Sequence, residues 1–433
     1  MAATLIRGGR VIDPSHHVDG VYDLLIENGK IAGINTPGPS ARTKSSEPRG
    51  ATVIDADGLL VTPGFIDVHT HLRQPGREDQ ETIETGSAAE LSGGFPTVCA
   101  MPNTTPAVDH RGMVDLIHRE AQRCNLVTVH PIGAMTRERQ GRELTDFGEL
   151  FDAGCVALSD DGNPVADGFL MRRALEYARV FGRPLIQHAE DPQLAAGGVM
   201  HEGLVATMLG LRGIPSEAES VLIARDVALA ELTGGWVHFA HLSSEQSVEL
   251  IRRAKARGVP VTCEATPHHL ALTHEAVEGF ETNAKVNPPL RTEQDRLALI
   301  EGLREGTIDC IATDHAPHTD WEKQADFDSA PFGISGLETA LGVCAEALIK
   351  PGLLTWGRLI ETLTANPAKI AGLESGTLGV GADADVVLID PGAQWTVDPT
   401  QFLSKGRHSP FAGRTLTGRV VRIWRHGVEA KFG

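Results

Sequence analysis

Strand-length apolar runs alternate with longer segments of helical periodicity between about residue 60 and residue 350. The segments 111–124, 169–182 and 247–258 place apolar residues at the spacing of one helix face. Alternation of this kind is typical of repeated strand–helix units that build a parallel sheet. Candidate strands lie at 64–69, 97–103, 127–133, 155–161, 184–190, 237–243, 261–269 and 309–315. Eight such units predict an α/β fold, a (β/α)8 barrel of the TIM type, with chemistry at the carboxyl ends of the strands.

The two ends of the chain have a different pattern. Strand-like segments lie at 4–13 and 22–34, around a loop rich in Ser, Pro and Arg, and again at 384–390 and 419–432. Neither end is long enough to bury a core of its own. We therefore expect residues 1–60 and 375–433 to pair as one small β-sandwich domain beside a barrel formed by residues 61–374.

Composition excludes several classes of partner. The chain has 57 acidic and 39 basic residues, a net charge of -18, and no block of Lys or Arg, which argues against binding to nucleic acid or to an anionic membrane. Its six cysteines are scattered without a C-x-x-C pair, and no apolar stretch approaches the ~20 residues of a membrane helix. The Met1 end has no basic region followed by an apolar stretch. We expect a soluble, reduced, cytoplasmic protein.

Side chains that bind metals follow several of the predicted strands. His69 and His71 are two positions apart at the end of the first strand, so both rings project to the same side. The fourth strand ends in Asp160 and Asp161, and strand alternation does not choose between them. The others are His188 on the fifth strand, His241 on the sixth and Asp314 on the eighth. Each alone has a structural explanation, such as a core histidine or a turn cap, but together they predict a metal site. Nitrogen and oxygen ligands suit zinc best, with manganese or cobalt as substitutes, and six ligands suffice for two ions.

This arrangement resembles the metal-dependent amidohydrolase superfamily. Its pattern is His-x-His on strand 1, a bridging group on strand 4, one His each on strands 5 and 6, and Asp on strand 8. Many relatives that act on cyclic amides bridge two metals with a carboxylated lysine, but this chain has no lysine between Lys44 and Lys255. An acidic bridge resembles the class I bacterial dihydroorotases, whose second Asp of SDDG is the ligand, which implies Asp161. The shared motifs are HLRQPG (71–76), MPNT (101–104), NPPLR (287–291), ATDHAPH (312–318) and PFGISGLE (331–338).

The resemblance implies a reaction and a catalytic group. The family hydrolyses the ring amide of (S)-dihydroorotate reversibly to N-carbamoyl-L-aspartate, the third step of pyrimidine biosynthesis, with one or two zinc ions. Such ions activate a water and polarise the amide carbonyl. Asp314 is then the proton shuttle, general base first and general acid second.

The substrate carboxylate needs a local positive group in so acidic a protein. Arg73 is the candidate, because its planar guanidinium holds a carboxylate with two parallel bonds. By resemblance, His71, Asn103, Asn287, His318, Phe332 and Gly333 complete the substrate contacts. The polar segment 319–328 that follows is either a mobile lid or a plain surface loop.

Two rival functions stay open on the sequence. One is hydrolysis of another cyclic amide, a hydantoin or allantoin, against which the missing lysine and the HLR and NPPLR motifs count. The other is an inactive structural partner of aspartate transcarbamoylase, although such relatives lack ligands that this chain keeps. Sequence alone does not decide between a homodimer and a complex of an active enzyme with the transcarbamoylase.

Overall fold

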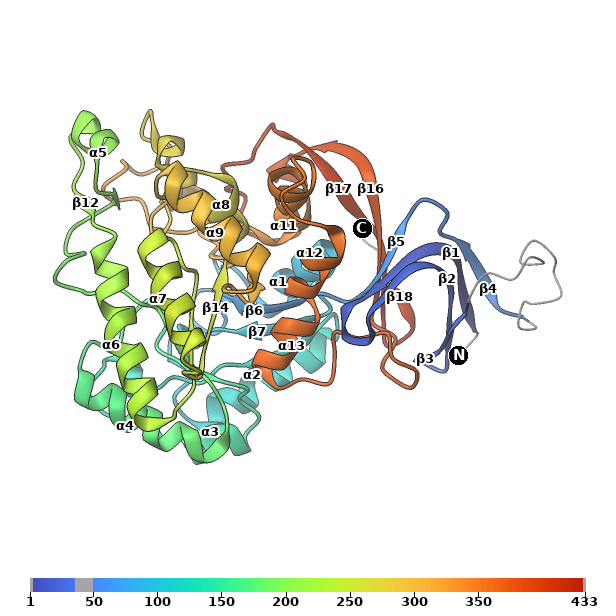
Figure 1. Ribbon diagram of the computed structural model, residues 1–433, viewed down its shortest axis with the longest axis horizontal. Coiled ribbons are helices and arrows are strands. Elements are labelled where there is room, and N and C mark those ends of the chain that lie inside the picture. Colours follow the sequence, from blue (N-terminus) through green and yellow to red (C-terminus); the bar gives the residue numbers. More distant parts are fainter. Residues whose placement is uncertain (1–2, 36–49, 431–433) are drawn as a thin grey trace.

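A barrel of parallel strands forms the larger part of the molecule (Figure 1). The computed structural model describes residues 3–35 and 50–430, so most of the loop rich in Ser, Pro and Arg lies outside the described residues. The barrel strands are β6 (Ile66–Thr70), β7 (Thr97–Ala100), β8 (Thr128–Pro131), β9 (Leu158–Ser159), β10 (Leu185–Gln187), β13 (Val237–Phe239), β14 (Val261–Ala265) and β15 (Cys310–Ile311). Each overlaps one of the eight predicted strands, which confirms the predicted barrel.

Backbone pairing closes the barrel at two seams. Strands β6, β7 and β8 form one parallel sheet, and β9, β10, β13, β14 and β15 form another. A bridge between Gly133 and Leu158 joins β8 to β9. At the other seam Thr70 bridges His315, and the His71 amide donates to the His315 carbonyl at 3.0 Å. The first and last strands therefore meet, as a closed barrel requires.

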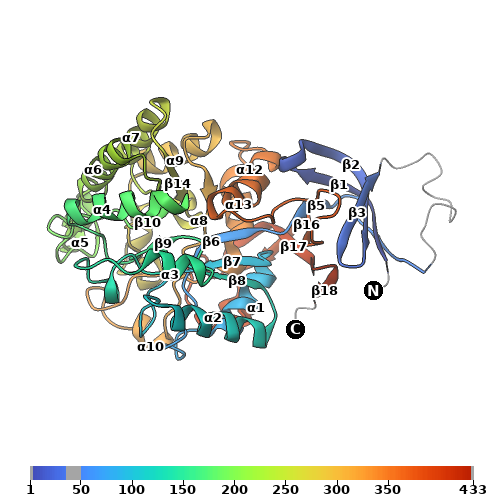
Figure 2. The same cartoon turned by 90° about the horizontal axis from the view of Figure 1, so that it is seen from below.

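Helices cover the outside of the barrel. They are α1 (Ile83–Gly93), α2 (Arg111–Cys124), α3 (Phe147–Asp152), α4 (Gly168–Ala178), α6 (Glu217–Thr233), α7 (Glu245–Ala256), α9 (Glu293–Glu305), α12 (Trp356–Leu363) and α13 (Ala365–Ala371). Thr82, Asp167 and Ser244 cap α1, α4 and α7 by accepting the amide three residues on. Figure 1 shows α4, α6, α7 and α9 side by side, and Figure 2 shows α1, α2 and α3 beside β6, β7 and β8.

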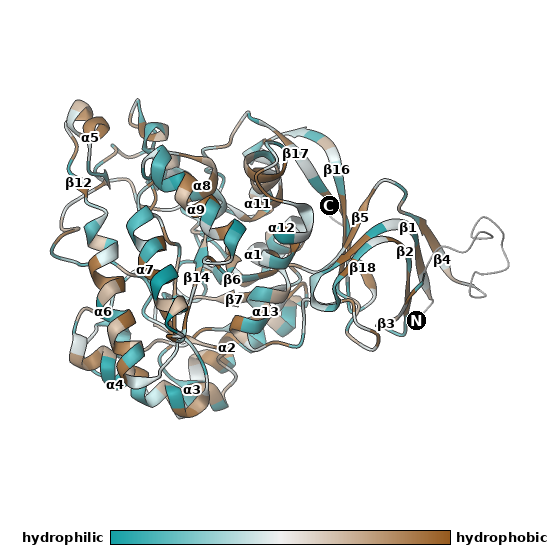
Figure 3. Ribbon diagram, in the orientation of Figure 1, coloured by the Kyte–Doolittle hydropathy of each residue, from teal (hydrophilic) through white to brown (hydrophobic). Residues whose placement is uncertain are grey.

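Apolar side chains fill the barrel and the layer beneath its helices. One buried cluster joins the strands to the helices, and Figure 3 shows both polar and apolar residues along α4, α6 and α7. A second cluster takes Val68, Met101, Ile186 and Ala312 from different sides of the barrel, so these residues meet in its interior. Among the described residues, no helix combines the length and the apolar character that crossing a membrane requires.

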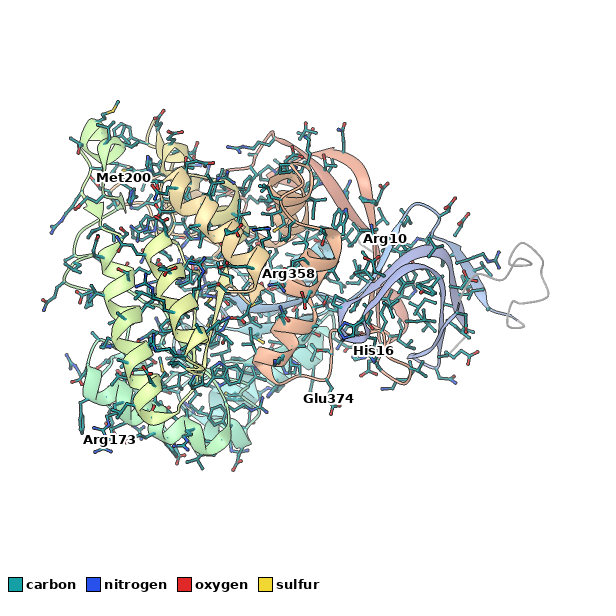
Figure 4. The ribbon with its side chains drawn as sticks, in the orientation of Figure 1. Arg10, His16, Arg173, Met200, Arg358 and Glu374 are labelled. Atoms are coloured by element: carbon teal, nitrogen blue, oxygen red, sulfur yellow. The ribbon has the colours of Figure 1, made fainter. Side chains whose placement is uncertain are left out.

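Shorter elements extend the loops between strands and helices. They are α8 (Pro267–Ala271), α10 (Asp320–Lys323), α11 (Ala340–Cys344), and an excursion formed by β11 (Met200–His201), α5 (Leu204–Leu209) and β12 (Gly213–Ile214). Arg358 of α12, labelled in Figure 4, donates to the carbonyl of Leu303 at 2.9 Å and so ties α12 to α9.

Both chain ends contribute to one eight-stranded, β-sandwich-like sheet beside the barrel, as predicted. Its strands are β1 (Thr4–Asp13), β2 (Val18–Glu27), β3 (Lys30–Asn35), β4 (Thr52–Asp55), β5 (Leu60–Pro63), β16 (Val386–Thr396), β17 (Thr415–Arg425) and β18 (Val428–Ala430). The order is β18-β17-β16-β5-β1-β2-β3, with β4 paired to β1. Ile6, Leu24, Leu388 and Trp424 from both ends form its buried cluster. The antiparallel pairing of β5 with β16 joins the two halves.

Candidate active site

The end of β6 is shaped to present two imidazoles. The register of β6 shifts between Asp67 and Thr70, and the Asp67 carboxylate accepts the amides of His69 at 3.2 Å and Thr313 at 3.0 Å. A shift of this kind re-aims the side chains that follow it. The rings of His69 and His71 consequently lie with centroids 5.3 Å apart at the mouth of the barrel.

Asp314, from the end of β15, faces both of these rings. Its Oδ1 lies 3.0 Å from His71 Nε2 and 3.4 Å from His69 Nε2. The Nδ1 atoms are already committed, His69 to Glu264 Oε1 at 2.6 Å and His71 to Asn103 Oδ1 at 2.8 Å. Those oxygens only accept, so each Nδ1 carries the ring proton and each Nε2 presents a lone pair. Two lone pairs that face a carboxylate require a positive charge between them.

Asp161 lies between these rings and a second pair of histidines. Its Oδ1 is 3.7 Å from both His188 Nδ1 and His241 Nε2, which are 2.9 Å from each other. The same Oδ1 is 3.5 Å from His69 Nε2, and Oδ2 is 3.5 Å from His71 Nε2. Within the described chain, His69 Nε2 and Asp161 Oδ1 are buried without a hydrogen-bond partner. Buried nitrogen and oxygen atoms that converge in this way fit one or two divalent cations.

The two acidic residues after β9 point to different partners. Asp160 accepts the Thr136 amide at 2.9 Å and also the Thr136 hydroxyl. Asp161 faces the four histidines instead. The structure thus places Asp161, and not Asp160, at the histidines, a choice that strand alternation left open. It also brings together all six candidate metal ligands that were predicted from the sequence.

The histidines of the cluster lower the pKa values of its two carboxylates. Burial raises the pKa of Asp161, but the neighbouring His69, His188 and His241 outweigh burial and hold that pKa well below its usual value. Burial likewise opposes ionisation of Asp314, whose pKa is nevertheless lowered by His69 and His71. Both carboxylates are therefore ionised at neutral pH, the form that binds cations.

A cavity of about 240 Å³ opens onto this cluster. It is lined by His71, Arg73, Asn103, Asp161, Gly162, His188, His241, Val286, Asn287, Asp314, Ala316, His318, Phe332 and Gly333. Every residue that the sequence suggested for the site lines it, except the fully buried His69. A cavity of this size accommodates a small ring.

Arg73 brings a positive charge to the cavity. Its Nε donates to the Pro317 carbonyl at 3.3 Å, and no described carboxylate forms an ion pair with it. Burial lowers its pKa to about 10, so the guanidinium stays charged at neutral pH. Arg73, His241 and Asp314 also have left-handed backbones, with φ of 58°, 32° and 47°. Such strain is concentrated at functional sites.

The opposite wall is built from the loops after β14 and β15. His318 Nε2 donates to the Phe332 carbonyl at 2.7 Å, and burial lowers the His318 pKa to about 3, so this ring is neutral. Gly333 has φ 146°, and a Cβ added there would lie 2.5 Å from the Ala316 carbonyl oxygen. Asn287 Oδ1 is buried without a partner among the described residues. The cavity therefore combines charged, neutral polar and backbone groups.

Glu264 of β14 also belongs to the site, although it was not predicted from the sequence. This fully buried carboxylate binds His69 Nδ1, lies 3.1 Å from His238 Nε2, and accepts the His241 amide at 3.3 Å. Its contacts with His69 and His238 outweigh burial and lower its pKa to about 2. A charged residue inside the apolar run 261–265 is the signal that could have found it. Glu264 orients His69, since carboxylates commonly fix the tautomer of such rings.

Comparisons with known proteins agree with this geometry. A family profile described as dihydro-orotase-like matches residues 58–247. A dihydroorotase of Anaeromyxobacter dehalogenans (strain 2CP-C) is 53% identical over 418 residues, covering 96% of this chain and 95% of that protein. One from Syntrophus aciditrophicus (strain SB) is 50% identical over 417 residues, covering 96% of each.

Solved structures share the fold. An L-hydantoinase (dihydropyrimidinase) from Arthrobacter aurescens superposes with a TM-score of 0.86 at 27% identity, covering 100% of this chain and 97% of its own. A dihydropyrimidinase from Brevibacillus agri NCHU1002, at 23% identity and a TM-score of 0.83, covers 99% and 94% of the two chains and shows the fold alone. The dihydroorotase relatives are far more similar in sequence. The chain therefore belongs to the dihydroorotase family of metal-dependent cyclic amidohydrolases.

Proposed function

We propose that this enzyme hydrolyses the ring amide of (S)-dihydroorotate reversibly to N-carbamoyl-L-aspartate, as the third step of pyrimidine biosynthesis. The observation that carries the proposal is Arg73, a cation without an ion pair among the described residues, on the same cavity as the cluster of histidines and aspartates. Dihydroorotate matches this pairing because it joins a ring amide to a carboxylate. Hydantoin and allantoin have no carboxylate for Arg73.

We assign zinc as the metal, with one or two ions per chain. His69, His71 and Asp314 would hold one ion, His188 and His241 a second, and Asp161 would bridge them. A bound divalent cation supplies polarisation of the amide carbonyl and a lowered pKa for the attacking water. The support is the donor set itself, in particular the unpartnered His69 Nε2 and Asp161 Oδ1.

Asp314 moves the proton. Its ionised carboxylate accepts a proton from the attacking water as the new carbon–oxygen bond forms. It then delivers that proton to the ring nitrogen as the carbon–nitrogen bond breaks. Its left-handed backbone at φ 47° and its position 3.0 Å from His71 Nε2 place the carboxylate at the cavity.

The remaining cavity residues orient the ring. Arg73 binds the substrate carboxylate with two parallel charge-assisted bonds, and Asn103 and Asn287 supply neutral hydrogen bonds. His318 is held neutral and, with the backbone of Phe332 and Gly333, bounds the opposite side of the ring. His71 contributes both to the metal and to the substrate side of the cavity.

The cellular setting is also part of the proposal. A reduced, cytoplasmic location is supported by six free cysteines, of which Cys124 is half-buried and the other five are buried. Assembly as a homodimer or with aspartate transcarbamoylase stays a prediction. The inactive-partner alternative expects lost ligands, whereas this chain retains all six candidate ligands and Arg73.

A substrate panel tests the proposal. Purified zinc-loaded enzyme is assayed with L-dihydroorotate, hydantoin and allantoin at equal concentrations, with formation of the ring-opened product as the readout. Selective opening of dihydroorotate is expected. Preferential opening of hydantoin or allantoin would contradict the substrate assignment, and a metal-loaded enzyme inactive on all three would favour the structural-partner alternative.

A further inference from the structure

Two lysines lie buried beside the substrate cavity. Lys285 directly precedes Val286 and Asn287 of the cavity wall, and Lys323 ends helix α10 within the segment that the sequence left as either lid or surface loop. Their exposed fractions are 2% and 4%. Lysine is rarely buried to this extent without a counter-ion. Yet neither ammonium forms an ion pair within the part of the chain that the structure describes.

Backbone carbonyls take the place of a counter-ion. An ammonium has three N–H donors, and each lysine has three carbonyl oxygens in reach. Lys285 Nζ donates to Phe327 at 2.5 Å, Ala330 at 2.7 Å and Asp328 at 3.1 Å. Lys323 Nζ donates to Pro331 and Gly333 at 3.0 Å each and to Lys285 at 3.5 Å. Backbone carbonyls within residues 327–333 thus surround the two lysine amines.

These bonds reach the cavity wall directly. Gly333 lines the cavity, its carbonyl binds Lys323, and its amide donates to the Lys285 carbonyl at 2.9 Å. In the sequence Phe332 lies between Pro331 and Gly333, whose carbonyls both bind Lys323. The Phe332 ring centroid is 4.7 Å from Lys285 Nζ, and the Phe332 carbonyl accepts a hydrogen bond from His318. The position of this wall therefore depends on the two lysines.

The contacts do not depend on one charge state of Lys323. Burial and the adjacent charge of Lys285 lower its pKa to about 7, whereas Glu281 acts in the opposite sense. A neutral amine keeps two N–H donors, enough for the carbonyls of Pro331 and Gly333.

We propose that Lys285 and Lys323 are positioning residues that clamp residues 319–333 against the substrate cavity and thereby set the wall formed by Phe332 and Gly333. The segment is then a wall held in place from within rather than a plain surface loop. The kinetic part of this inference rests on the proposed function, but its structural part does not.

Hydrogen exchange and kinetics test the clamp together. Lys323→Met and Lys285→Met keep the length and apolar stem of lysine and remove its donors. We expect faster amide exchange confined to residues 319–333, and KM for dihydroorotate raised about tenfold with kcat changed less than about threefold, because the loss falls on substrate binding. Lys350→Met is the matched control, since Lys350 is exposed and forms a surface ion pair with Glu346, and it should change neither readout.

Several outcomes would overturn the proposal. Unchanged amide exchange over residues 319–333 in both variants would refute the clamp. If KM rises in the same variants while exchange stays unchanged, the lysines act on the substrate directly through their charge and not by positioning the wall. If the variants fail to fold, acetylation of the wild-type amines decides, because Lys285 and Lys323 should react far more slowly than Lys350, and equal rates would refute the clamp. Exchange and acetylation remain informative even if the enzyme does not open dihydroorotate.

Discussion

Removal of the Arg73 guanidinium should lower kcat/KM for the substrate strongly and lower the stability of the free enzyme little. Among the described residues the Arg73 guanidinium donates one hydrogen bond, to the Pro317 carbonyl, and forms no ion pair, so its loss costs little in the free enzyme. Two charge-assisted bonds to the substrate carboxylate are worth roughly 1.5–3 kcal/mol each. Because water replaces part of these bonds, a loss of about 3–5 kcal/mol is expected, which is roughly 10²- to 10⁴-fold in kcat/KM.

Steady-state hydrolysis of dihydroorotate by Arg73→Ala, with metal content measured in parallel, tests this reasoning. KM should account for most of the loss, and metal content should stay at the wild-type value. Arg73→Lys should recover only part of it, since an ammonium lacks the planar fork. Arg123→Ala is the control, because Arg123 is exposed and pairs with Glu84 and Glu120. A KM within about threefold of wild type in Arg73→Ala would refute the assignment.

Further predictions concern the proton shuttle, the bridge and a remote carboxyl. Asp314→Asn should lower kcat by at least about 10²-fold, because an amide cannot carry the proton, and near-normal kcat would remove Asp314 from the mechanism. Asp161→Asn should reduce the amount of bound metal measured after dialysis. Asp160→Asn should retain the metal but lower Tm, because it weakens the hydrogen bonds to Thr136. Equal loss of metal in the two variants would refute this distinction. Burial raises the pKa of Glu338 to about 7. The folded state therefore binds the proton more tightly than the unfolded state, and stability should fall as pH rises from about 4.5 to about 7. Glu338→Gln should flatten this slope in Tm, raising Tm at pH 8 relative to wild type, and an unchanged slope would contradict the burial argument.

The barrel could be predicted because its signal is local. Most strands are short apolar runs that end in a polar residue, and helices such as α2, α4 and α7 have apolar residues at the spacing of one helix face. The pairing of the two chain ends followed from their lack of a separate core. The excursion through β11, α5 and β12 was not predicted, since two-residue strands such as Met200–His201 leave no periodic trace.

The site was predictable in its types of side chain but not in its contacts. The spacing of His69 and His71 predicts that both rings project to the same side. The sequence does not predict that β6 shifts its register or that the Asp67 carboxylate accepts the His69 amide there. Glu264 meets His69 across 195 residues of sequence. Lys323 looked like one charge in a polar segment, and only the folded chain shows it buried among carbonyls. Long-range partners of this kind leave no local signal.

Stepwise restoration of metal tests the central claim most directly. The enzyme is stripped with a chelator, dialysed and titrated with Zn²⁺ while dihydroorotate hydrolysis and bound zinc are measured on the same samples. We expect no turnover in the stripped enzyme, and recovery in proportion to bound zinc that saturates at one or two ions per chain. Full turnover by metal-free enzyme, or zinc binding without any hydrolysis of dihydroorotate, would contradict it.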